Sequence, residues 1–567
     1  MDALRPAALA ALLLVALLVT GACTPPDRGM DDRPERIDAL FEQFREGDRP
    51  GLAVAVIENG ETVFARGYGL ASLEHRVPIT PSTVFDIASI SKQFAGLSVA
   101  MLVEEGAISL DDDVRTHLPE LADFGPAITV DHLVHHTSGI RDWPGALAVA
   151  GWSFDDVISF DQILDFAFHQ RTLNFEPGSE YTYSNTGYNL LAETVARVSG
   201  RSFREWTDER LFRPLGMTST HFHDDHTEVV VNRAFGYAPD DEGGWHLTPN
   251  NLTALGSSSL YTTVEDLAKW VANFDAGTVG GDALELWATP GVLNDGSENP
   301  YAFGIVNGEY RGMPMLQHSG SWASFRTQLT YLPERRLGVV VLANHPANTG
   351  AHAQAVLDAW LDPAHGEDEG RDGAQAAATA EHEGDGASVS VARDRMAEYV
   401  GVYRLGPGWY VEITLGPDGL TTQATRESAF PMTPRSETEF WVDGYGSSIT
   451  FLRGAGGEVD AIEYRGERRP KMGLRTPMSA QALARLAGTY ESDELRTAYG
   501  VAVDGEGLVL THARHGELRL EQAWQNEFTG SVFFLQAVEF RSTPDGGTEM
   551  VINAGERNRD IVFLRRR

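Results

Sequence analysis

The hydrophobic pattern of the chain predicts two antiparallel hairpins that lie far apart in the sequence. The apolar run Gly51–Ile57 is followed by Asn59-Gly60 and by a second apolar run, Thr62–Ala65. An Asn-Gly pair between two such runs is typical of a tight hairpin turn. A second pair of β-rich runs, Arg326–Tyr331 and Leu337–Ala343, flanks a short polar turn and predicts the second hairpin.

Helical periodicity fills the sequence between these hairpins. It is carried by Ser91–Glu105, Tyr188–Ser199 and Val264–Asn273, and Thr263 is expected to cap the third of these helices. Strands at both ends with helices between them predict one antiparallel sheet that is closed by both ends of a domain. We place this domain at residues 36–362 and expect an α+β fold.

Composition predicts several ordered domains and excludes one class of partner. The 567 residues exceed a single compact domain, and a hydrophobic share of 42% allows most of the chain to bury a core. The net charge of −36 argues against nucleic-acid binding. Residues 363–390 differ from the rest, since they are rich in acidic residues, Gly and Ala, and they predict a flexible acidic linker.

The last third of the chain contains an internal repeat. Gly401-Val-Tyr403 recurs as Gly488-Thr-Tyr490, and three further landmarks recur in the same order at nearly the same spacing. Each copy holds short alternating strands separated by Gly-rich turns, which is typical of small β-barrels or sandwiches. We therefore expect two β domains, at residues 391–475 and 480–567.

The N-terminus resembles a bacterial lipoprotein signal peptide. Arg5 precedes the apolar run Ala7–Val19, whose 13 residues are too few to span a membrane. Small residues then lead to Cys23, the one Cys of the chain, so an internal disulfide is excluded. We expect residues 1–22 to be removed and Cys23 to be lipidated, with residues 23–35 as a tether to a membrane facing the periplasm or cell exterior. The alternative is an ordinary cleaved signal with an incidental Cys.

Lysine usage singles out one residue. The chain has three Lys, Lys92, Lys269 and Lys471, among 45 basic residues. A Lys kept against this bias indicates a role that Arg cannot fill, because Arg does not lose its proton to act as a base. Ser89 precedes Lys92 by three residues at the start of a predicted helix, so hydroxyl and amine share one face. Burial would lower the pKa of the amine and let it take the serine proton, and the helix N-terminus favours a developing oxyanion. The alternative is a capping Ser with an exposed Lys.

Two further motifs are weak when read alone. Tyr183-Ser-Asn185 lies at a loop-to-helix junction, where the Tyr could relay protons and the amide could bind Lys92 and a substrate carbonyl. A packed Tyr with a capping Asn explains this motif as well. His318-Ser-Gly320 precedes a predicted strand. An edge strand of small residues can lie against a substrate backbone while a main-chain N–H completes an oxyanion hole.

The three motifs follow one another in the order Ser-x-x-Lys, Tyr-x-Asn and His-x-Gly. With these motifs in this order, residues 36–362 resemble the serine beta-lactamase and penicillin-binding protein superfamily, in its class C-like branch of esterases and D-aminopeptidases. Connecting phrases share the resemblance: Gly67–Ala71, Phe85–Ser89, His136–Gly139, Phe175–Gly178 and Leu215–Met217. The resemblance implies a beta-lactamase/transpeptidase-like domain, with an antiparallel sheet, flanking helices and a helical subdomain, followed by two small lipocalin-like β-barrels. D-aminopeptidases of this superfamily are similar in carrying two such barrels, and a loop from a barrel can enter their active site.

The resemblance also implies a role for each motif residue. Ser89 would be the acylated nucleophile, Lys92 its base, and Tyr183 the group that shuttles the proton. Asn185 would hydrogen-bond Lys92 and the substrate, and the backbone N–H groups of Ser89 and Ser321 would form the oxyanion hole. No metal or organic cofactor is implied.

His318 departs from the family pattern. True beta-lactamases of this shape usually carry Lys-Thr-Gly here, and a neutral His would attract a substrate carboxylate less. The resemblance therefore favours a serine hydrolase of short D-amino-acid peptides, amides or esters. Carboxylesterase, true beta-lactamase or DD-peptidase activity, and a non-catalytic lipoprotein that binds cell-wall peptides, stay open as alternatives. His221–His226 has metal-like spacing but no helix to hold it, so no metal site is expected, and the oligomeric state is left open.

Overall fold

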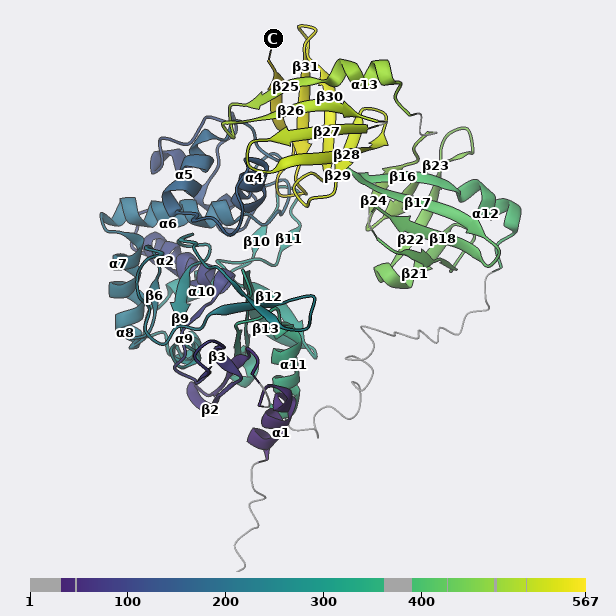
Figure 1. Ribbon diagram of the computed structural model, residues 1–567. Coiled ribbons are helices and arrows are strands. Elements are labelled where there is room, and N and C mark those ends of the chain that lie inside the picture. The colour runs from purple at the N-terminus through teal and green to yellow at the C-terminus, as the bar shows by residue number, and fades with distance from the viewer. Residues whose placement is uncertain are drawn as a thin grey trace, which may run out of the picture.

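The structure is a computed structural model that describes residues 32–45, 48–361, 390–425, 427–473, 477–505 and 507–566 (Figure 1). The predicted signal peptide, Cys23 and all but the last residue of the predicted linker lie outside these ranges. Helix α1 (Arg33–Leu40) begins inside the stretch predicted as a tether, because Pro34 suits a first helical turn and Ile37 is buried. None of the described helices is long and apolar enough to cross a membrane.

A six-stranded antiparallel sheet forms the centre of the first domain, in the order β12-β13-β14-β15-β1-β2. Strand β1 (Leu52–Glu58) pairs with β2 (Glu61–Tyr68) on one side and with β15 (Leu337–Ala343) on the other. The two predicted hairpins therefore lie side by side, and the sheet is closed by both ends of the domain, as predicted. The strands that complete it are β14 (Phe325–Leu332), β13 (Met313–Trp322) and β12 (Val306–Tyr310).

Strand β1 is buried on both faces of the sheet. Successive side chains of a strand point to opposite faces, so Val54 and Val56 join one core while Ala53, Ala55 and Ile57 join the other. A strand covered on both sides needs apolar residues at every position. This explains why the sequence shows an unbroken apolar run here rather than an alternation.

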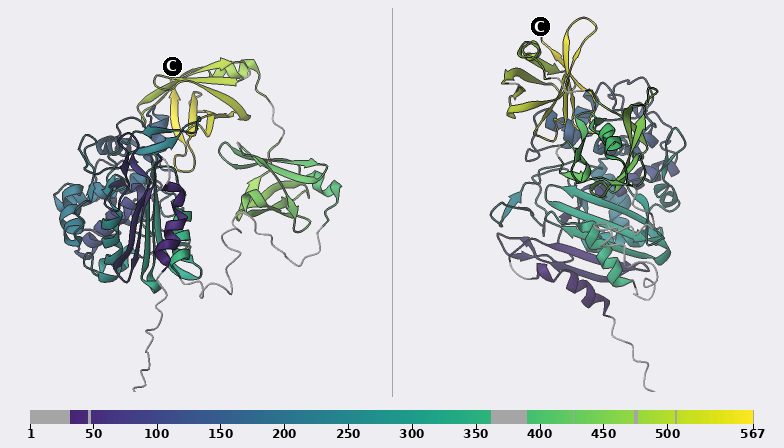
Figure 2. Two further views of the ribbon diagram at one scale, coloured as in Figure 1. Left: turned by 60° about the horizontal axis from the view of Figure 1, so that its bottom comes forward. Right: turned by 90° about the vertical axis from the view of Figure 1, so that its right-hand side faces the viewer.

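Helices cover the two faces of this sheet (Figure 2). Helices α1 and α11 (Thr349–Trp360) pack on one face, and α2 (Lys92–Glu104) and α9 (Val264–Ala276) pack on the other. As predicted, the Thr263 hydroxyl caps α9 by accepting a hydrogen bond from the N–H of Asp266 at 3.1 Å. The other helices of the domain are α3 (Val130–Val134), α4 (Trp143–Val149), α5 (Phe160–His169), α6 (Asn185–Ser199), α7 (Phe203–Thr207), α8 (Arg213–Leu215) and α10 (Ala283–Trp287). Short strands in the connecting segments are β3 (Leu70–Ser72), β4 (Val77–Pro78), β5 (Phe85–Asp86), β6 (His221–Phe222), β7 (Gly236–Pro239), β8 (Trp245–Thr248), β9 (Leu260–Thr262), β10 (Gly291–Val292) and β11 (Glu298–Asn299).

The second C-terminal module is a closed antiparallel barrel, which confirms the barrel prediction for this part of the chain. It follows helix α13 (Ala480–Leu486) and closes in the order β25 to β32. Its strands are β25 (Gly488–Ser492), β26 (Thr497–Asp504), β27 (Gly507–His512), β28 (Gly516–Trp524), β29 (Glu527–Gly530), β30 (Ala537–Ser542), β31 (Thr548–Asn553) and β32 (Ile561–Arg565). Full closure leaves no strand edge unpaired.

The first C-terminal module is more open than a closed barrel. It follows helix α12 (Arg393–Tyr399) and forms two antiparallel sheets, β16 to β19 and β20 to β24, around one shared core. The chain passes between the sheets at Pro431 and Pro434, and proline has no N–H to continue a ladder. The strands are β16 (Gly401–Gly406), β17 (Trp409–Gly416), β18 (Gly419–Ala424), β19 (Ala429–Pro431), β20 (Thr433–Pro434), β21 (Glu439–Val442), β22 (Ser447–Arg453), β23 (Val459–Tyr464) and β24 (Glu467–Pro470).

The repeat read from the sequence has a structural counterpart. In both modules a short helix precedes the strand with the Gly-x-Tyr motif. Tyr403 donates a hydrogen bond to the carbonyl of Tyr399 at 2.7 Å, and Tyr490 donates to that of Leu486 at 2.8 Å. In each copy the Tyr therefore ties its strand to the end of the helix four residues earlier.

The closed barrel packs directly on the helical subdomain, above α4 and α5 in Figure 1. Side chains of α4, including Trp143 and Ala146, belong to the same buried cluster as Tyr490, Leu510 and Phe528 of the barrel. The more open module contacts this barrel through the carboxylate of Glu527, which accepts hydrogen bonds from Tyr410 and Arg404. The barrel thus reaches the first domain near the predicted site.

Candidate active site

Ser89 lies in a tight turn between β5 and α2. Ala88 adopts a φ of 47°, a left-handed conformation that is uncommon for a residue with a side chain, and its N–H donates to Asp86 Oδ1 at 2.8 Å. The turn continues into a 3₁₀ segment, Ala88–Ser91, that leads directly into α2. Such strained turns are often found at functional sites, and this one sets Ser89 at the start of the helix that carries Lys92.

Strand β13 lies close against this turn. A Cβ atom on Gly320 would lie 2.3 Å from the carbonyl oxygen of Ile87 and 3.1 Å from the backbone nitrogen of Ser89. Only glycine fits without a shift, because the first of these neighbours is backbone. The Thr327 hydroxyl donates to the same Ile87 carbonyl at 2.9 Å and fixes the approach of the strand. Gly320 therefore brings the backbone of β13 beside the backbone of Ser89.

Lys92 is fully buried, and its amine lies between three oxygen atoms. Nζ is 3.1 Å from Ser89 Oγ, 2.8 Å from Asn185 Oδ1 and 2.7 Å from the carbonyl oxygen of Ser257. A neutral amine has two N–H groups and one lone pair. The two carbonyl-type oxygens can only accept, so they take both N–H groups and leave the lone pair facing Ser89.

Burial lowers the pKa of Lys92 well below its usual value. The charge of Asp142 opposes this effect, and the charge of Arg557 adds to it. A lowered pKa supplies the neutral amine that this geometry requires. Geometry and electrostatics thus agree that Lys92 can accept the hydroxyl proton of Ser89, which the alternative of an exposed Lys does not allow.

Tyr183 keeps its proton at this site. Burial raises the pKa of its hydroxyl, against the opposing effects of a hydrogen bond with Ser89 and of the charge of Arg557. Lys92 Nζ lies 4.8 Å from the centroid of the Tyr183 ring. A phenol that stays protonated next to Ser89 can donate a proton to a leaving group on the carbonyl carbon that Ser89 attacks.

Asp142 is a functional candidate that the sequence did not reveal. Its Oδ1 accepts hydrogen bonds from the backbone N–H and the side-chain Nδ2 of Asn185, at 2.8 and 3.0 Å. These contacts fix the amide so that Asn185 Oδ1 points at Lys92. The only sequence signal was a polar residue directly before Trp143-Pro144, which is typical of a helix N-cap.

His318 is buried and neutral. Its Nδ1–H donates to the carbonyl of Ser319 at 2.6 Å, so Nε2 accepts from the Tyr301 hydroxyl at 2.9 Å. Burial, assisted by the charge of Lys92, lowers the pKa of His318 to about 3. Strand β13 therefore presents no positive charge where true beta-lactamases are expected to carry one.

A cavity of about 280 Å³ opens at Ser89. Of the predicted residues, those that line it are Ser89, Tyr183, Asn185, His318 and Ser321, and Lys92 and Gly320 are not among the lining residues. The remaining lining residues are Trp143, Pro144, Leu252, Ser257, Ser258, Ser319, Trp322 and Arg557. A larger cavity, of about 500 Å³, lies inside the more open β module away from Ser89 and is not part of this site.

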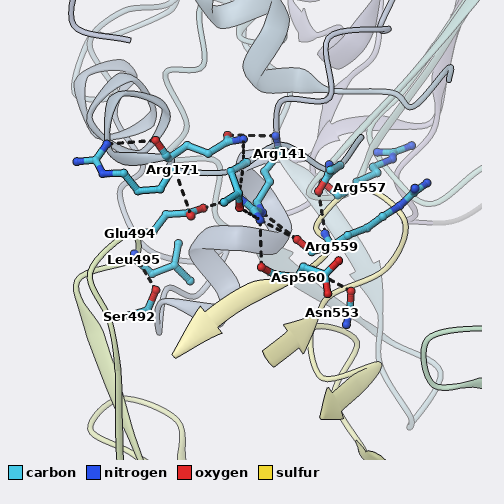
Figure 3. Close-up of polar contacts among 12 residues, drawn as sticks. Arg141, Arg171, Ser492, Glu494, Leu495, Asn553, Arg557, Arg559 and Asp560 are labelled. Atoms are coloured by element: carbon cyan, nitrogen blue, oxygen red, sulfur yellow. Dashed lines mark hydrogen bonds and ion pairs between the residues drawn. The ribbon is translucent and has the colours of Figure 1, made fainter. Parts of the chain in front are cut away.

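Arg557 comes from the closed barrel, on the loop between β31 and β32. Figure 3 shows this loop, with Arg557 and Arg559, against the first domain near Arg141. The Arg557 carbonyl accepts hydrogen bonds from the N–H of Asp142 at 3.1 Å and from Asn174 Nδ2 at 2.8 Å. This loop therefore brings a residue of the barrel to the wall of the cavity.

Three residues near β6 have the spacing of a metal site, and the carboxylate among them is already paired with an arginine. One ligand atom each from His221, His223 and Glu228 lies within 4.8 Å of the others. Arg204 donates to both carboxylate oxygens of Glu228, at 2.6 and 2.9 Å. The arginine supplies the positive charge that the carboxylate requires.

Comparisons with known proteins cover the first domain and extend into the β modules. Residues 37–361 match the family described as Beta-lactamase. The chain is 31% identical over 313 residues to a D-aminopeptidase of Gluconobacter oxydans, a match that covers 55% of this chain and 59% of that protein. It is 25% identical over 449 residues to penicillin-binding protein 4* of Bacillus subtilis, which covers 76% of this chain and 97% of that one.

Among solved structures, the octameric penicillin-binding protein homologue of Pyrococcus abyssi has a TM-score of 0.53 and 23% identity, and the match covers 86% of this chain and 98% of that one. This similarity shows the fold, and it includes the region of the β modules. The family match spans more than half of the chain and contains the Ser89, Tyr183 and His318 motifs. The chain belongs to the beta-lactamase family.

Proposed function

We propose that the chain is a serine hydrolase that forms an acyl-enzyme on Ser89 and acts on short D-amino-acid peptides, amides or esters. The observation that carries the proposal is the amine of Lys92, which is fully buried, bound by two carbonyl-type acceptors, and 3.1 Å from Ser89 Oγ. A 31% identical relative named D-aminopeptidase supports the substrate class.

The reaction begins when Lys92 takes the Ser89 proton and Oγ attacks the substrate carbonyl carbon. The backbone N–H groups of Ser89 and Ser321 bind the oxyanion that forms, and the close approach of β13 at Gly320 supports this pairing. Tyr183 donates its proton to the leaving amine or alcohol and is reprotonated from Lys92. Water then attacks the acyl-enzyme by the reverse sequence of proton transfers and releases the acid.

The substrate panel that tests this proposal compares wild type with Ser89→Ala. The probes are a D-alanine anilide, its L-isomer, a short-chain aryl ester and a chromogenic cephalosporin. We expect cleavage of the D-anilide that depends on Ser89, because the alanine variant has no nucleophile. Chromophore release is the measurement.

Each other outcome of this panel favours a different activity. Ester cleavage without anilide cleavage would indicate a carboxylesterase, and cephalosporin turnover a true beta-lactamase. Equal rates for wild type and Ser89→Ala on every probe would contradict the mechanism. The absence of turnover and of acylation with all four probes would favour a non-catalytic binding protein.

We also propose that Cys23 anchors the protein to a membrane that faces the periplasm or the cell exterior. The apolar run before Cys23 and its position as the one Cys of the chain support this. Cys23→Ala expressed from the full chain is expected to move from the membrane fraction to the soluble fraction. Unchanged fractionation of the variant would disprove the anchor.

A further inference from the structure

The active-site cavity contains an arginine that takes part in no proton transfer of the proposed mechanism. Among the described residues, those that line the cavity include no carboxylate, and His318 is neutral. Arg557, whose side chain is 51% exposed, is the one formally charged residue among them. The charge expected of true beta-lactamases on the strand at His318 is missing there, and a cation reaches the cavity from the barrel instead.

The backbone that carries Arg557 is held in place before any substrate arrives. Its carbonyl accepts from Asp142 N and Asn174 Nδ2, and Asn174 Oδ1 accepts from the N–H of Arg559 at 2.8 Å. Arg559 in turn pairs with Glu180 at 2.9 Å. A guanidinium on a fixed backbone loses less conformational entropy when it binds a ligand.

The guanidinium of Arg557 has donors to spare. Its Nη1 donates to Asp142 Oδ2 at 3.3 Å, the one hydrogen bond that the described residues give this side chain. The guanidinium carbon lies 4.8 Å from the Tyr183 ring centroid, so the group sits over the side chain that serves the leaving group. A guanidinium has five N–H groups in a fork that fits a carboxylate.

We propose that Arg557 binds a carboxylate of the substrate, so that the site prefers anionic D-amino-acid derivatives to those with a free ammonium group. This inference rests on the proposed function and narrows its substrate class. A carboxylate in the cavity meets Arg557, whose buried ion-pair partner Asp142 is not among the lining residues. A free ammonium meets an arginine and no carboxylate to bind it, which is unfavourable.

The test uses two matched pairs of D-alanine anilides, which place the carboxylate in either half of the substrate. N-succinyl and N-acetyl-D-alanine 4-nitroanilide differ in the acyl half. N-acetyl-D-alanine 4-carboxyanilide and 4-carbamoylanilide differ in the leaving half. The readout is the ratio of kcat/KM for the charged member of each pair to that for the neutral member.

In wild type at least one ratio is expected to exceed one, and Arg557→Gln should lower it by about 10- to 100-fold, the usual value of a hydrogen bond between charged groups. Arg557→Lys keeps the charge and should keep part of the preference. The matched control is Arg566→Gln, which removes the same charge from the same barrel at a side chain that is 66% exposed, pairs with Glu491 and does not line the cavity, and it should leave the ratio at its wild-type value. Melting temperatures of the three variants check that each is folded.

Two results separate the failure of this inference from failure of the proposed function. Cleavage that depends on Ser89 but shows the same two ratios in wild type and Arg557→Gln overturns the role of Arg557 alone. Cleavage that is independent of Ser89 overturns the proposed function. A higher kcat/KM in wild type for free D-alanine 4-nitroanilide than for the N-succinyl compound also overturns the inference.

Discussion

Replacing Lys92 by arginine is expected to lower kcat/KM for a D-alanine anilide by more than about 100-fold, the usual contribution of a general base. The reason is that a guanidinium stays protonated in proteins and cannot take the proton of Ser89. The amine in the native site has two carbonyl-type acceptors and one contact with Ser89, which suits a neutral base. Steady-state kinetics of the purified variant give the measurement.

Another of the three lysines of the chain, Lys269, offers a matched control. Lys269→Arg makes the same change at a side chain that is 43% exposed and pairs with Asp266 at 2.7 Å. This variant should retain wild-type kinetics. Since Lys92 is buried, the melting temperature of Lys92→Arg must be compared with wild type as well. Wild-type activity in a folded Lys92→Arg protein would show that Lys92 is not the base.

The same lysine determines the expected pH dependence. Burial lowers the pKa of Lys92 well below its usual value, and the neutral amine is the active form. The rate should therefore rise with pH through the lowered pKa and stay high above it. The unfolded chain binds a proton on this lysine at pH values between the lowered and the usual pKa, so its contribution to the free energy of unfolding rises with pH in that window. A rate that falls with pH across the same window would contradict the assignment.

Local patterns in the sequence predicted the parts of the fold that depend on neighbouring residues. The apolar run of β1, the turn at Asn59-Gly60 and the cap of α9 at Thr263 each occupy a few consecutive positions. The Ser89 and Lys92 pair is also local, since one helical turn places both on one face. The hairpin and the helix cap were confirmed, because they depend mainly on residues that are close in the sequence.

The rest of the site depends on contacts that no local pattern encodes. Arg557 meets Asp142 across 415 positions of the chain, and Lys92 meets the carbonyl of Ser257 across 165. A backbone carbonyl carries no sequence signal, because every residue has one. The openness of the first β module likewise follows from where Pro431 and Pro434 lie relative to its ladders, and the repeat alone did not show this.

One fully buried arginine lies in the interface that positions the Arg557 loop, and removing it should destabilise the protein. Arg141 is fully buried and binds Glu494 Oε1 at 2.8 Å, the Thr172 carbonyl at 2.6 Å and the Arg559 carbonyl at 2.8 Å (Figure 3). Arg141→Met leaves Glu494 buried without its partner. A broken buried ion pair costs about 3–5 kcal/mol in the free energy of unfolding. Urea unfolding of the variant beside wild type measures the loss.

Two further variants separate the ion pair from a general loss of contacts. Arg171→Met changes an exposed arginine of the same cluster and should alter stability by no more than about 0.5 kcal/mol. Arg141→Met combined with Glu494→Met removes both charges and should recover much of the loss, because no unpaired buried carboxylate is left. A double variant as unstable as the single one would show that packing, not charge, holds the barrel here.

Since Arg141 also binds the carbonyls of Arg559 and Asp560, Arg141→Met frees the loop that carries Arg557. The preference for the carboxylate-bearing anilide should therefore fall in Arg141→Met even though Arg557 itself is intact.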